Sequence, residues 1–317
     1  MNRKPVIIDC DPGHDDMVAM VLAIGSDVLD VKAVTCVPGN KSLEKVVKNA
    51  VHVVDYIGSD CIVAGGARSG LVNETVETDI SIAFHGQSGL DGFEFPTDIK
   101  TKPSPKDAIE VMADVLRNSE EKVTIIATGP LTNIALMIRA LPQLMHKVEC
   151  ISLMGGTCNF LFEKPFMEYN TYTDPEASKI VFESGLPIMM YGYDVTYTAL
   201  YTTDFIDRVE AIGNETSKMV GALMRKFMTL HNKAFLDLGG CPVHDACAVA
   251  GVIDPSVVTD VRPMNVTIDT KSEYLYGATI CDYDGRLKDA KKNANVVFKL
   301  DNEKFFDLIY NSVKNLK

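Results

Sequence analysis

VIIDCDPGHDD, residues 6–16, is the stretch that decides the fold of this chain. The apolar residues 6–8 predict a buried strand, and the run MVAMVLAIG that starts at Met17 has the periodicity of a helix. A turn through Pro12 and Gly13 separates the two. The strand end and the helix start together carry four carboxylates: Asp9, Asp11, Asp15 and Asp16. In an open α/β sheet, ligands bind at this edge.

Four carboxylates this close repel one another unless a positive charge lies among them or their pKa values rise. No Lys or Arg occurs from residue 5 to residue 31, so a hard divalent cation with oxygen ligands is the natural counter-charge. Helix capping is the alternative for Asp15 and Asp16, because acidic residues gain from the helix dipole at its start. Asp9 and Asp11 are alternate strand residues that share one face, which favours the metal site.

Composition limits the classes of protein to which the chain can belong. Its 317 residues suffice for one large α/β domain, and contents of 46% hydrophobic and 23% charged residues are typical of soluble globular proteins. A net charge of −12 and a pI near 5.0 argue against nucleic acid or an anionic membrane as the main partner.

The N-terminal sequence MNRKPVIID is too short in apolar length for a signal peptide, and no apolar run reaches the roughly 18 residues of a membrane span. We therefore expect a cytoplasmic protein with no membrane partner. The eight scattered cysteines contain no C-x-x-C pair, so reduced core thiols are expected rather than a zinc site.

Strand and helix patterns alternate as far as residue 191. Strands are predicted at 31–37, 61–64, 123–127, 148–154 and 187–191. Helices are predicted at 42–57, 105–117, after Pro130 to about 140, and from Asp174. This alternation predicts an α/β fold with an open, mainly parallel central sheet and flanking helices, a Rossmann-like core.

The remaining segments complete this assignment. Long loops are predicted at 66–104 and from 155 to 172, and HGQSGLDG at 85–92 suggests that the first is functional. Residues 203–253 are predicted to be mostly helical, with a break at LGGCPVHDA. Strands at 257–268, 274–282 and 295–300 and a helix at 302–315 follow. Because no linker-like stretch divides the sequence, one domain is expected over residues 1–317.

Polar residues follow the predicted strand ends. They are Asn40, Thr128, the segment from Met154 to Asn159, Glu168, Asn170, and the pair His244-Asp245 before a helix. Taken singly, each has an ordinary interpretation, such as a turn residue for Asn40 or an N-cap for Asp245. Taken together, they place carboxylates, amides and a histidine beside the first acidic cluster, which makes this face the candidate site.

Six motifs follow one another along the chain. They are IIDCDPGHDD, VPGN at 37–40, ATGPLTN at 127–133, LMGG at 153–156, EYNTYTDPEA at 168–177 and PVHDACAV at 242–249. In these motifs the chain resembles the inosine-uridine-preferring nucleoside hydrolase family. The resemblance implies a tightly held Ca²⁺ at the strand ends and a homo-oligomer, either a dimer or a tetramer. It also implies hydrolysis of the N-ribosidic bond of nucleosides for nucleoside salvage.

The resemblance also implies residue roles. Asp11 would be a calcium ligand and the general base, and Asp16, Asp245 and the Thr128 carbonyl would complete the protein ligands, with Asp9 behind them. The ribose would be held by Asp15, Asn40, Glu168 and Asn170, with Asn159 and the Met154 backbone nearby. His244 and His85 are the candidates for protonating the leaving base, and His85 also counts as a substrate contact.

The implied mechanism is direct attack of a calcium-bound water on an oxocarbenium-like sugar, with inversion of configuration. Uridine, cytidine and inosine are the substrates expected first. The wall that faces the base is expected near residues 76–90 and 225–240.

Two alternatives stay open. Asp9-Cys10-Asp11 also resembles the D-x-D of haloacid-dehalogenase-type phosphatases, although Gly13 stands where that family has a hydroxyl residue and its later Lys is not evident. A nucleoside-binding protein without catalysis is the second. Release of phosphate, of free base, or of neither distinguishes the three.

Overall fold

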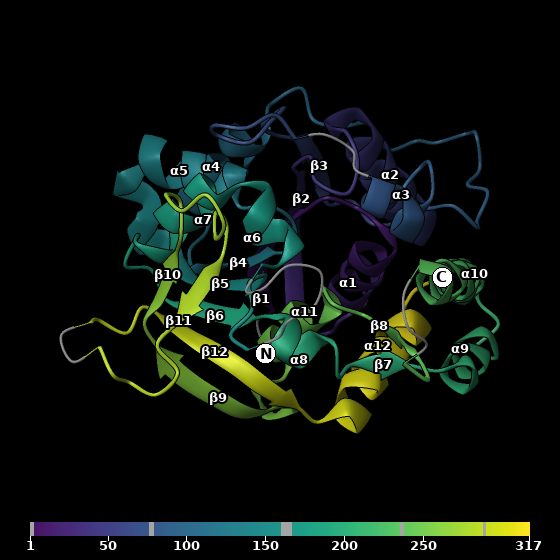
Figure 1. Cartoon of the computed structure of the whole chain (residues 1–317). Coiled ribbons are helices and arrows are strands. Elements are labelled where there is room, and N and C mark those ends of the chain that lie inside the picture. The colour runs from purple at the N-terminus through teal and green to yellow at the C-terminus, as the bar shows by residue number, and fades with distance from the viewer. Residues whose placement is uncertain (1–2, 76–78, 160–166, 235–237, 288–289) are drawn as a thin grey trace.

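The computed structural model describes residues 3–75, 79–159, 167–234, 238–287 and 290–317. Within these ranges, eight strands form one sheet in the order β3-β2-β1-β4-β5-β6-β12-β9 (Figure 1). The strands are β1 (Lys4–Cys10), β2 (Leu29–Cys36), β3 (Ile62–Gly65), β4 (Val123–Ala127), β5 (Val148–Met154), β6 (Ile188–Tyr191), β9 (Val258–Met264) and β12 (Ala294–Leu300).

Only the edge strand β9 runs antiparallel to its neighbour in this sheet. The open, mainly parallel α/β fold predicted from the sequence is confirmed. Strand β1 lies between β2 and β4, so the chain order reverses beside it. Open α/β sheets bind ligands at such a switch point, and the acidic stretch 9–16 begins there.

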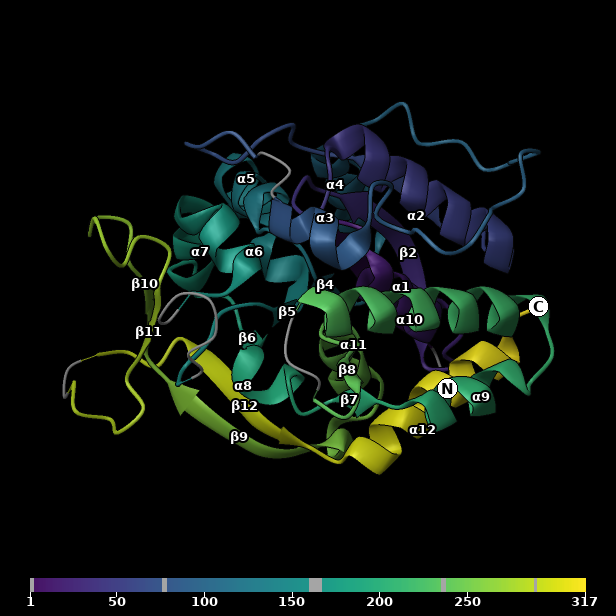
Figure 2. The same cartoon turned by 45° about the vertical axis from the view of Figure 1, so that its right-hand side comes forward.

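Helices cover both faces of the sheet because alternate strand residues point to opposite sides. Ile8 and Ile126 pack with α1 (His14–Ile24), α2 (Leu43–Ile57), α10 (Glu215–Ala234), α11 (Ala246–Ile253) and α12 (Asn302–Asn315). Ile7 and Ile125 pack with α4 (Ala108–Asn118), α5 (Thr132–Ala140) and α7 (Pro175–Phe182). Figure 2 shows the long helix α10 at the front, with α3 (Asp79–His85) above it and α12 below.

The smaller elements lie outside the main sheet. They are α6 (Tyr169–Thr173), α8 (Tyr193–Thr196), α9 (Thr203–Glu210), the 3-10 helices Pro142–Lys147 and Pro255–Val257, and the two-stranded pairs β7 (Leu200–Tyr201) with β8 (Cys241–Pro242) and β10 (Val266–Ile268) with β11 (Thr279–Cys281). No helix of the described residues is both long enough and apolar enough to cross a membrane.

Four expectations from the sequence need correction. The predicted loop 66–104 contains α3, and the predicted loop that ends at Tyr172 contains most of α6. The predicted strand 257–268 is divided between β9 in the main sheet and β10 in a second sheet. Of the predicted strand 274–282, only β11 is a strand, because Tyr274 is 83% exposed and lies in a turn.

The helix predicted from residue 105 starts at Ala108 because Asp107 caps it. The Asp107 carboxylate accepts the Glu110 N–H at 2.8 Å, and the Glu110 side chain accepts the Asp107 N–H at 3.3 Å. This reciprocal pair is a capping box, which fixes the first turn of a helix.

Asp174 provides a stability test of the predicted start of α7. Its buried carboxylate accepts the Ala177 N–H at 3.0 Å, the Leu71 N–H at 2.9 Å and the Thr132 hydroxyl at 2.6 Å. Asp174→Ala should lower the free energy of unfolding by roughly 2–4 kcal/mol, because a cap is lost and buried donors are left unpaired. Urea denaturation measures the change.

The matched control is Asp301→Ala at the exposed start of α12, where the carboxylate accepts one N–H, that of Lys304 at 3.2 Å. That variant should lose only about 1 kcal/mol. Equal losses in the two variants would contradict a special role for the Asp174 network.

Candidate active site

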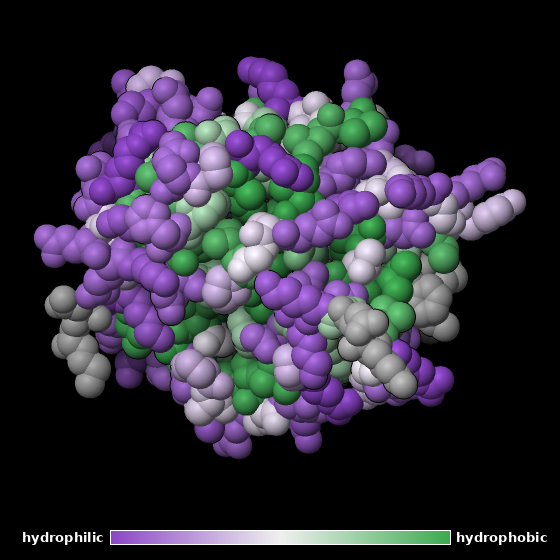
Figure 3. Space-filling model, turned by 90° about the vertical axis from the view of Figure 1, so that its left-hand side faces the viewer, coloured by the Kyte–Doolittle hydropathy of each residue, from purple (hydrophilic) through white to green (hydrophobic). Residues whose placement is uncertain are grey.

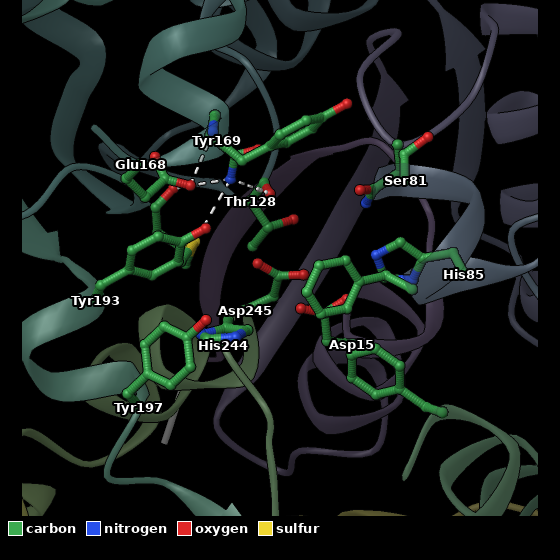
Figure 4. Close-up of a pocket in the computed structure, with 15 residues that line it drawn as sticks. Asp15, Ser81, His85, Thr128, Glu168, Tyr169, Tyr193, Tyr197, His244 and Asp245 are labelled. Atoms are coloured by element: carbon green, nitrogen blue, oxygen red, sulfur yellow. Dashed lines mark hydrogen bonds between the residues drawn. The ribbon is translucent and has the colours of Figure 1, made fainter. Parts of the chain in front are cut away.

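A cavity that is partly open to solvent lies at the carboxyl ends of β1, β4 and β5 (Figure 4). Carboxylates, amides, imidazoles and aromatic rings line it. The lining residues are Asp15, Asn40, Ser81, Phe84, His85, Thr128, Met154, Glu168, Tyr169, Asn170, Tyr193, Tyr197, Phe227, His244 and Asp245.

Three carboxylates meet at the floor of this cavity. Oxygen atoms of Asp15, Asp16 and Asp245 lie within 4.8 Å of one another, and all three residues are buried. Asp15 and Asp16 come from the first turn of α1, and Asp245 precedes α11, which packs against α1. The packing of two helices thus brings together residues 229 positions apart in the chain (245 − 16).

Asp11 is fitted tightly beside this cluster. Its Oδ2 accepts the Asn40 N–H at 2.5 Å. A Cβ built on Gly39 would lie 2.2 Å from Asp11 Oδ2, and one built on Gly129 would lie 2.8 Å from Oδ1. Glycine is therefore required at both neighbouring turns by the space that Asp11 occupies, which explains why the turns after β2 and β4 read VPGN and ATGP.

Asp16 is held in place by donors from three elements. Its Oδ1 accepts the Thr128 hydroxyl at 2.8 Å, and its Oδ2 accepts the Gly13 N–H at 3.0 Å and the Asn40 amide at 3.2 Å. In contrast, Oδ1 of Asp11 and Oδ1 of Asp15 are buried with no hydrogen-bond partner among the described residues. Two buried carboxylate oxygens are therefore left for a ligand.

The ionisation of these groups reflects burial and mutual repulsion. Burial, followed by the charge of Asp16, raises the pKa of Asp15 to about 7. Burial raises the pKa of Asp16 to about 6. The pKa values of Asp11 and Asp245 also lie well above their usual range, first because of burial and then because of neighbouring carboxylates. An oxygen-liganded divalent cation fits this donor set, since it would neutralise the charges and bind the unpaired Oδ1 of Asp11.

Asp9 lies behind the cluster and does not line the cavity. Its Oδ1 accepts the Thr35 hydroxyl at 2.6 Å and the Asn133 amide at 2.9 Å. Burial raises its pKa to about 7. These contacts join the end of β1 to β2 and α5, a position suited to orienting the cluster from behind.

Two of the residues predicted to hold the sugar, Glu168 and Asn170, belong to the start of α6. Glu168 accepts the N–H groups of Asn170 (2.8 Å), Thr171 (3.0 Å) and Gly156 (2.9 Å), so its carboxylate both caps α6 and fixes the loop after β5. Asn170 donates to the carbonyl oxygens of Thr128 at 2.9 Å and Met154 at 3.2 Å. These bonds join the ends of β4 and β5 to α6.

Asn159 differs from the other predicted sugar contacts. Its side chain is exposed and is not among the groups that line the cavity, and its N–H donates to Asp194 at 2.7 Å. The residues that follow it, 160–166, lie outside the described ranges. A contact between Asn159 and the substrate therefore stays a prediction without support from the geometry.

Imidazole and aromatic rings form the opposing walls of the cavity. His244 lies against Tyr193 and Tyr197, with ring centroids 5.4 and 4.8 Å away, and its Nδ1 is 2.8 Å from the Thr196 hydroxyl. Figure 4 shows His85 on the other side of the cavity from His244. Burial lowers the pKa of His244 to about 3 and that of His85 well below its usual value.

The wall expected near residues 76–90 and 225–240 is partly described. Ser81, Phe84 and His85 of α3 and Phe227 of α10 line the cavity, while residues 76–78 and 235–237 lie outside the described ranges. The sequence interpretation missed Tyr193 and Tyr197. The signal that could have found them is YDVTY directly after the strand 188–191, at the same sheet edge as the other site residues.

Comparison with known proteins identifies the family of the chain. The model of the family "Inosine-uridine preferring nucleoside hydrolase" matches residues 6–307. The pyrimidine-specific ribonucleoside hydrolase RihA of Escherichia coli (strain K12) is 40% identical over 311 residues, which cover 98% of each chain.

Two solved structures are similar to the whole chain. The purine-preferring ribonucleoside hydrolase from Gardnerella vaginalis superposes with a TM-score of 0.91 at 28% identity, covering 98% of both chains. An inosine-guanosine nucleoside hydrolase superposes with a TM-score of 0.88 at 28% identity, covering 98% of this chain and 99% of the other. By fold and sequence the chain belongs to the inosine-uridine preferring nucleoside hydrolase family and is a ribonucleoside hydrolase.

Proposed function

We propose that this hydrolase cleaves ribonucleosides to ribose and free base with Ca²⁺ in its carboxylate cluster, and that uridine, cytidine and inosine are its first substrates. The observation that carries the proposal is the cluster of Asp15, Asp16 and Asp245 at the floor of a cavity walled by imidazole and aromatic rings. A relative at 40% identity that is named pyrimidine-specific favours the pyrimidine nucleosides.

Asp11, Asp16, Asp245 and the Thr128 carbonyl would hold the ion. Bound Ca²⁺ would lower the pKa of a water molecule and order the sugar hydroxyls. Asp11, whose Oδ1 has no hydrogen-bond partner in the described part of the chain, would take the proton from the attacking water. Asp15, whose Oδ1 is likewise unpaired within the described ranges, would accept a ribose hydroxyl. Attack is direct, so the sugar configuration inverts and no covalent sugar intermediate forms.

The other polar side chains would position the sugar and stabilise the transition state. Asn40, Glu168 and Asn170 are locked by their own hydrogen bonds before substrate arrives, and such preorganised dipoles stabilise the positive charge that develops on the ribose. His244 and His85 face the base from opposite sides and would stabilise its departure.

We also propose a cytoplasmic homo-oligomer, a dimer or a tetramer, that serves nucleoside salvage. All eight cysteines are free thiols, which is consistent with a reducing compartment. Apolar side chains that a partner copy could cover are exposed near β10 and β11, among them Tyr274 (83%), Ile280 (45%) and Leu287 (58%). Figure 3 shows hydrophobic residues between the polar ones on the left-hand side of the molecule, where Figure 1 places these strands. Sedimentation velocity tests the assembly.

The function is tested by assaying ribose and free-base release from uridine, cytidine, inosine, adenosine and guanosine, with and without a calcium chelator. We expect release from the first three that the chelator abolishes and Ca²⁺ restores. Phosphate release from phosphate esters would instead favour the phosphatase alternative, and tight nucleoside binding without release would favour a binding protein.

Asp11→Asn tests the general base. Asn keeps a ligand oxygen but cannot accept a proton, so kcat should fall by about 10²–10⁴-fold while calcium stays bound. Kinetics on uridine together with metal analysis measure both quantities. Asp60→Asn, at an exposed position, is the control and should match the wild type. Near-normal turnover of the Asp11 variant with metal bound would rule out the base.

Without metal, the stability of the protein should fall as the pH rises. Because the folded-state pKa values of Asp15 (about 7) and Asp16 (about 6) exceed the ordinary aspartate value of 3.8, the metal-free fold binds protons that the unfolded chain releases. This contribution is fully present below about pH 4 and is lost as pH rises through 6–7.

We therefore expect the Tm of the metal-free protein to fall by roughly 5–10 °C between pH 5 and pH 8. Saturating Ca²⁺ should remove most of the fall, because the cation compensates the ionised carboxylates. Scanning calorimetry with and without chelator measures both curves. A metal-free Tm that stays level or rises over this range would contradict the repulsion.

His244→Ala separates a role toward the base from a role toward the sugar. Natural bases leave poorly, so their turnover should fall by about 10²–10⁴-fold, whereas a nitrophenyl riboside, which needs no proton, should be slowed much less. The control is His146→Ala, an exposed histidine remote from the cavity. Equal losses on all substrates would move His244 to the sugar side of the site.

A further inference from the structure

His85 is held by the first turn of α1. The main-chain N–H of His14, the first residue of that helix, donates to His85 Nδ1 at 3.2 Å. A main-chain N–H can only donate, so Nδ1 of His85 must carry a lone pair and the neutral ring must carry its proton on Nε2. This contact also satisfies one of the N–H groups that a helix start leaves unpaired.

The ring of His14 lies beside the same nitrogen of His85. Its Nε2 lies 2.8 Å from the Asp91 carbonyl oxygen, which can only accept, so a neutral His14 carries its proton there. Its Nδ1, 3.4 Å from His85 Nδ1, is then also an acceptor, and the main-chain N–H remains the donor to His85.

Packing leaves the His85 ring little freedom. His14 and His85 stack at 5.6 Å, and Phe227 stacks on each of them at 5.3 Å. A Cβ on Gly13 would lie 2.6 Å from His85 Nδ1, so glycine is needed for the ring to reach the helix start. The positive end of α1 and the charge of Lys41 both oppose protonation of this ring.

The other ring nitrogen is left for a ligand. His85 lines the cavity, and no hydrogen bond joins its Nε2 to another of the described residues. We propose that His85 acts on the leaving base as a neutral hydrogen-bond donor through Nε2–H, and that His14 is the positioning residue that holds it in this tautomer. The inference rests on the proposed nucleoside hydrolysis and specifies the part that His85 plays in it.

A neutral donor suits one class of leaving group. As the glycosidic bond of a pyrimidine nucleoside such as uridine breaks, negative charge spreads onto the carbonyl oxygens of the base. A fixed N–H directed at such an oxygen stabilises this charge without transferring a proton. In this role His85 does not act as a general acid. The ring keeps its Nδ1 lone pair and its Nε2 proton throughout.

Two near-isosteric variants distinguish the ring nitrogens. The amide of Gln reaches the place of Nε2, whereas the shorter Asn reaches only the place of Nδ1. His85→Gln should therefore keep kcat/KM for uridine within about tenfold of the wild type, and His85→Asn should lose about 10²–10³-fold, the usual cost of one lost transition-state donor. Equal losses in the two variants, with calcium content unchanged, would overturn the proposal.

Nitrogen NMR of the ¹⁵N-histidine-labelled protein tests the tautomer directly, with the His85 signals assigned by their loss in His85→Gln. We expect an unprotonated Nδ1 and a protonated Nε2 at neutral pH. A protonated Nδ1 would overturn the proposal. This result does not depend on turnover, so it stands apart from a failure of the proposed function, which would appear as a wild-type protein that hydrolyses no nucleoside.

The role of His14 is tested by a matched pair at the same position. His14→Ala keeps the main-chain N–H, and His14→Pro removes it at the first helical position, where proline is well tolerated after an extended residue such as Gly13 (φ −100°, ψ −164°). His14→Ala should preserve the His85 tautomer, and His14→Pro should lose it together with the rate that His85→Asn loses. A wild-type nitrogen spectrum and rate in a folded, calcium-loaded His14→Pro variant would remove His14 from this role.

Discussion

Repulsion among buried carboxylates is the constraint on which the rest of this site depends. Asp11, Asp15, Asp16 and Asp245 are all nine-tenths or more buried, and the charges of Asp11, Asp15 and Asp16 each raise the pKa of at least one other member of the group. The fold brings them together through a central strand, the helix after it and a second helix packed on the first. Without a counter-charge, such an arrangement lowers the free energy of unfolding. With a bound divalent cation, the same carboxylates would raise it.

The site is otherwise organised by main-chain donors. Glu168 is fixed by three N–H groups, and Asp16 and His85 are fixed by the N–H groups of Gly13 and His14. These donors belong to helix starts and to the loop after β5, so they move only if the fold moves. The residues that would meet the sugar and the base are consequently in place before substrate binds, as preorganised catalysis requires.

The strand-end half of this site could be predicted from sequence because its signals are local. Asp11, Asp16, Thr128 and Asp245 each stand where an apolar run ends or a helix begins, and parallel strands bring such positions to one edge. The opposing wall could not be predicted in detail, because α3 and α10 are distant in sequence and meet through tertiary packing. Tyr193, Tyr197 and the contact from His14 to His85 depend on that packing, as does the exposed position of Asn159.

The central claim, that a cation relieves the repulsion in the cluster, is tested most directly by counting protons. Calcium is titrated calorimetrically into metal-free protein at pH 6, in buffers of different ionisation enthalpy. Because the pKa values of Asp15 (about 7) and Asp16 (about 6) place protons on the cluster at this pH, one calcium per chain should bind and release about one proton or more. Binding without proton release, or equal binding to Asp16→Ala, would contradict the account.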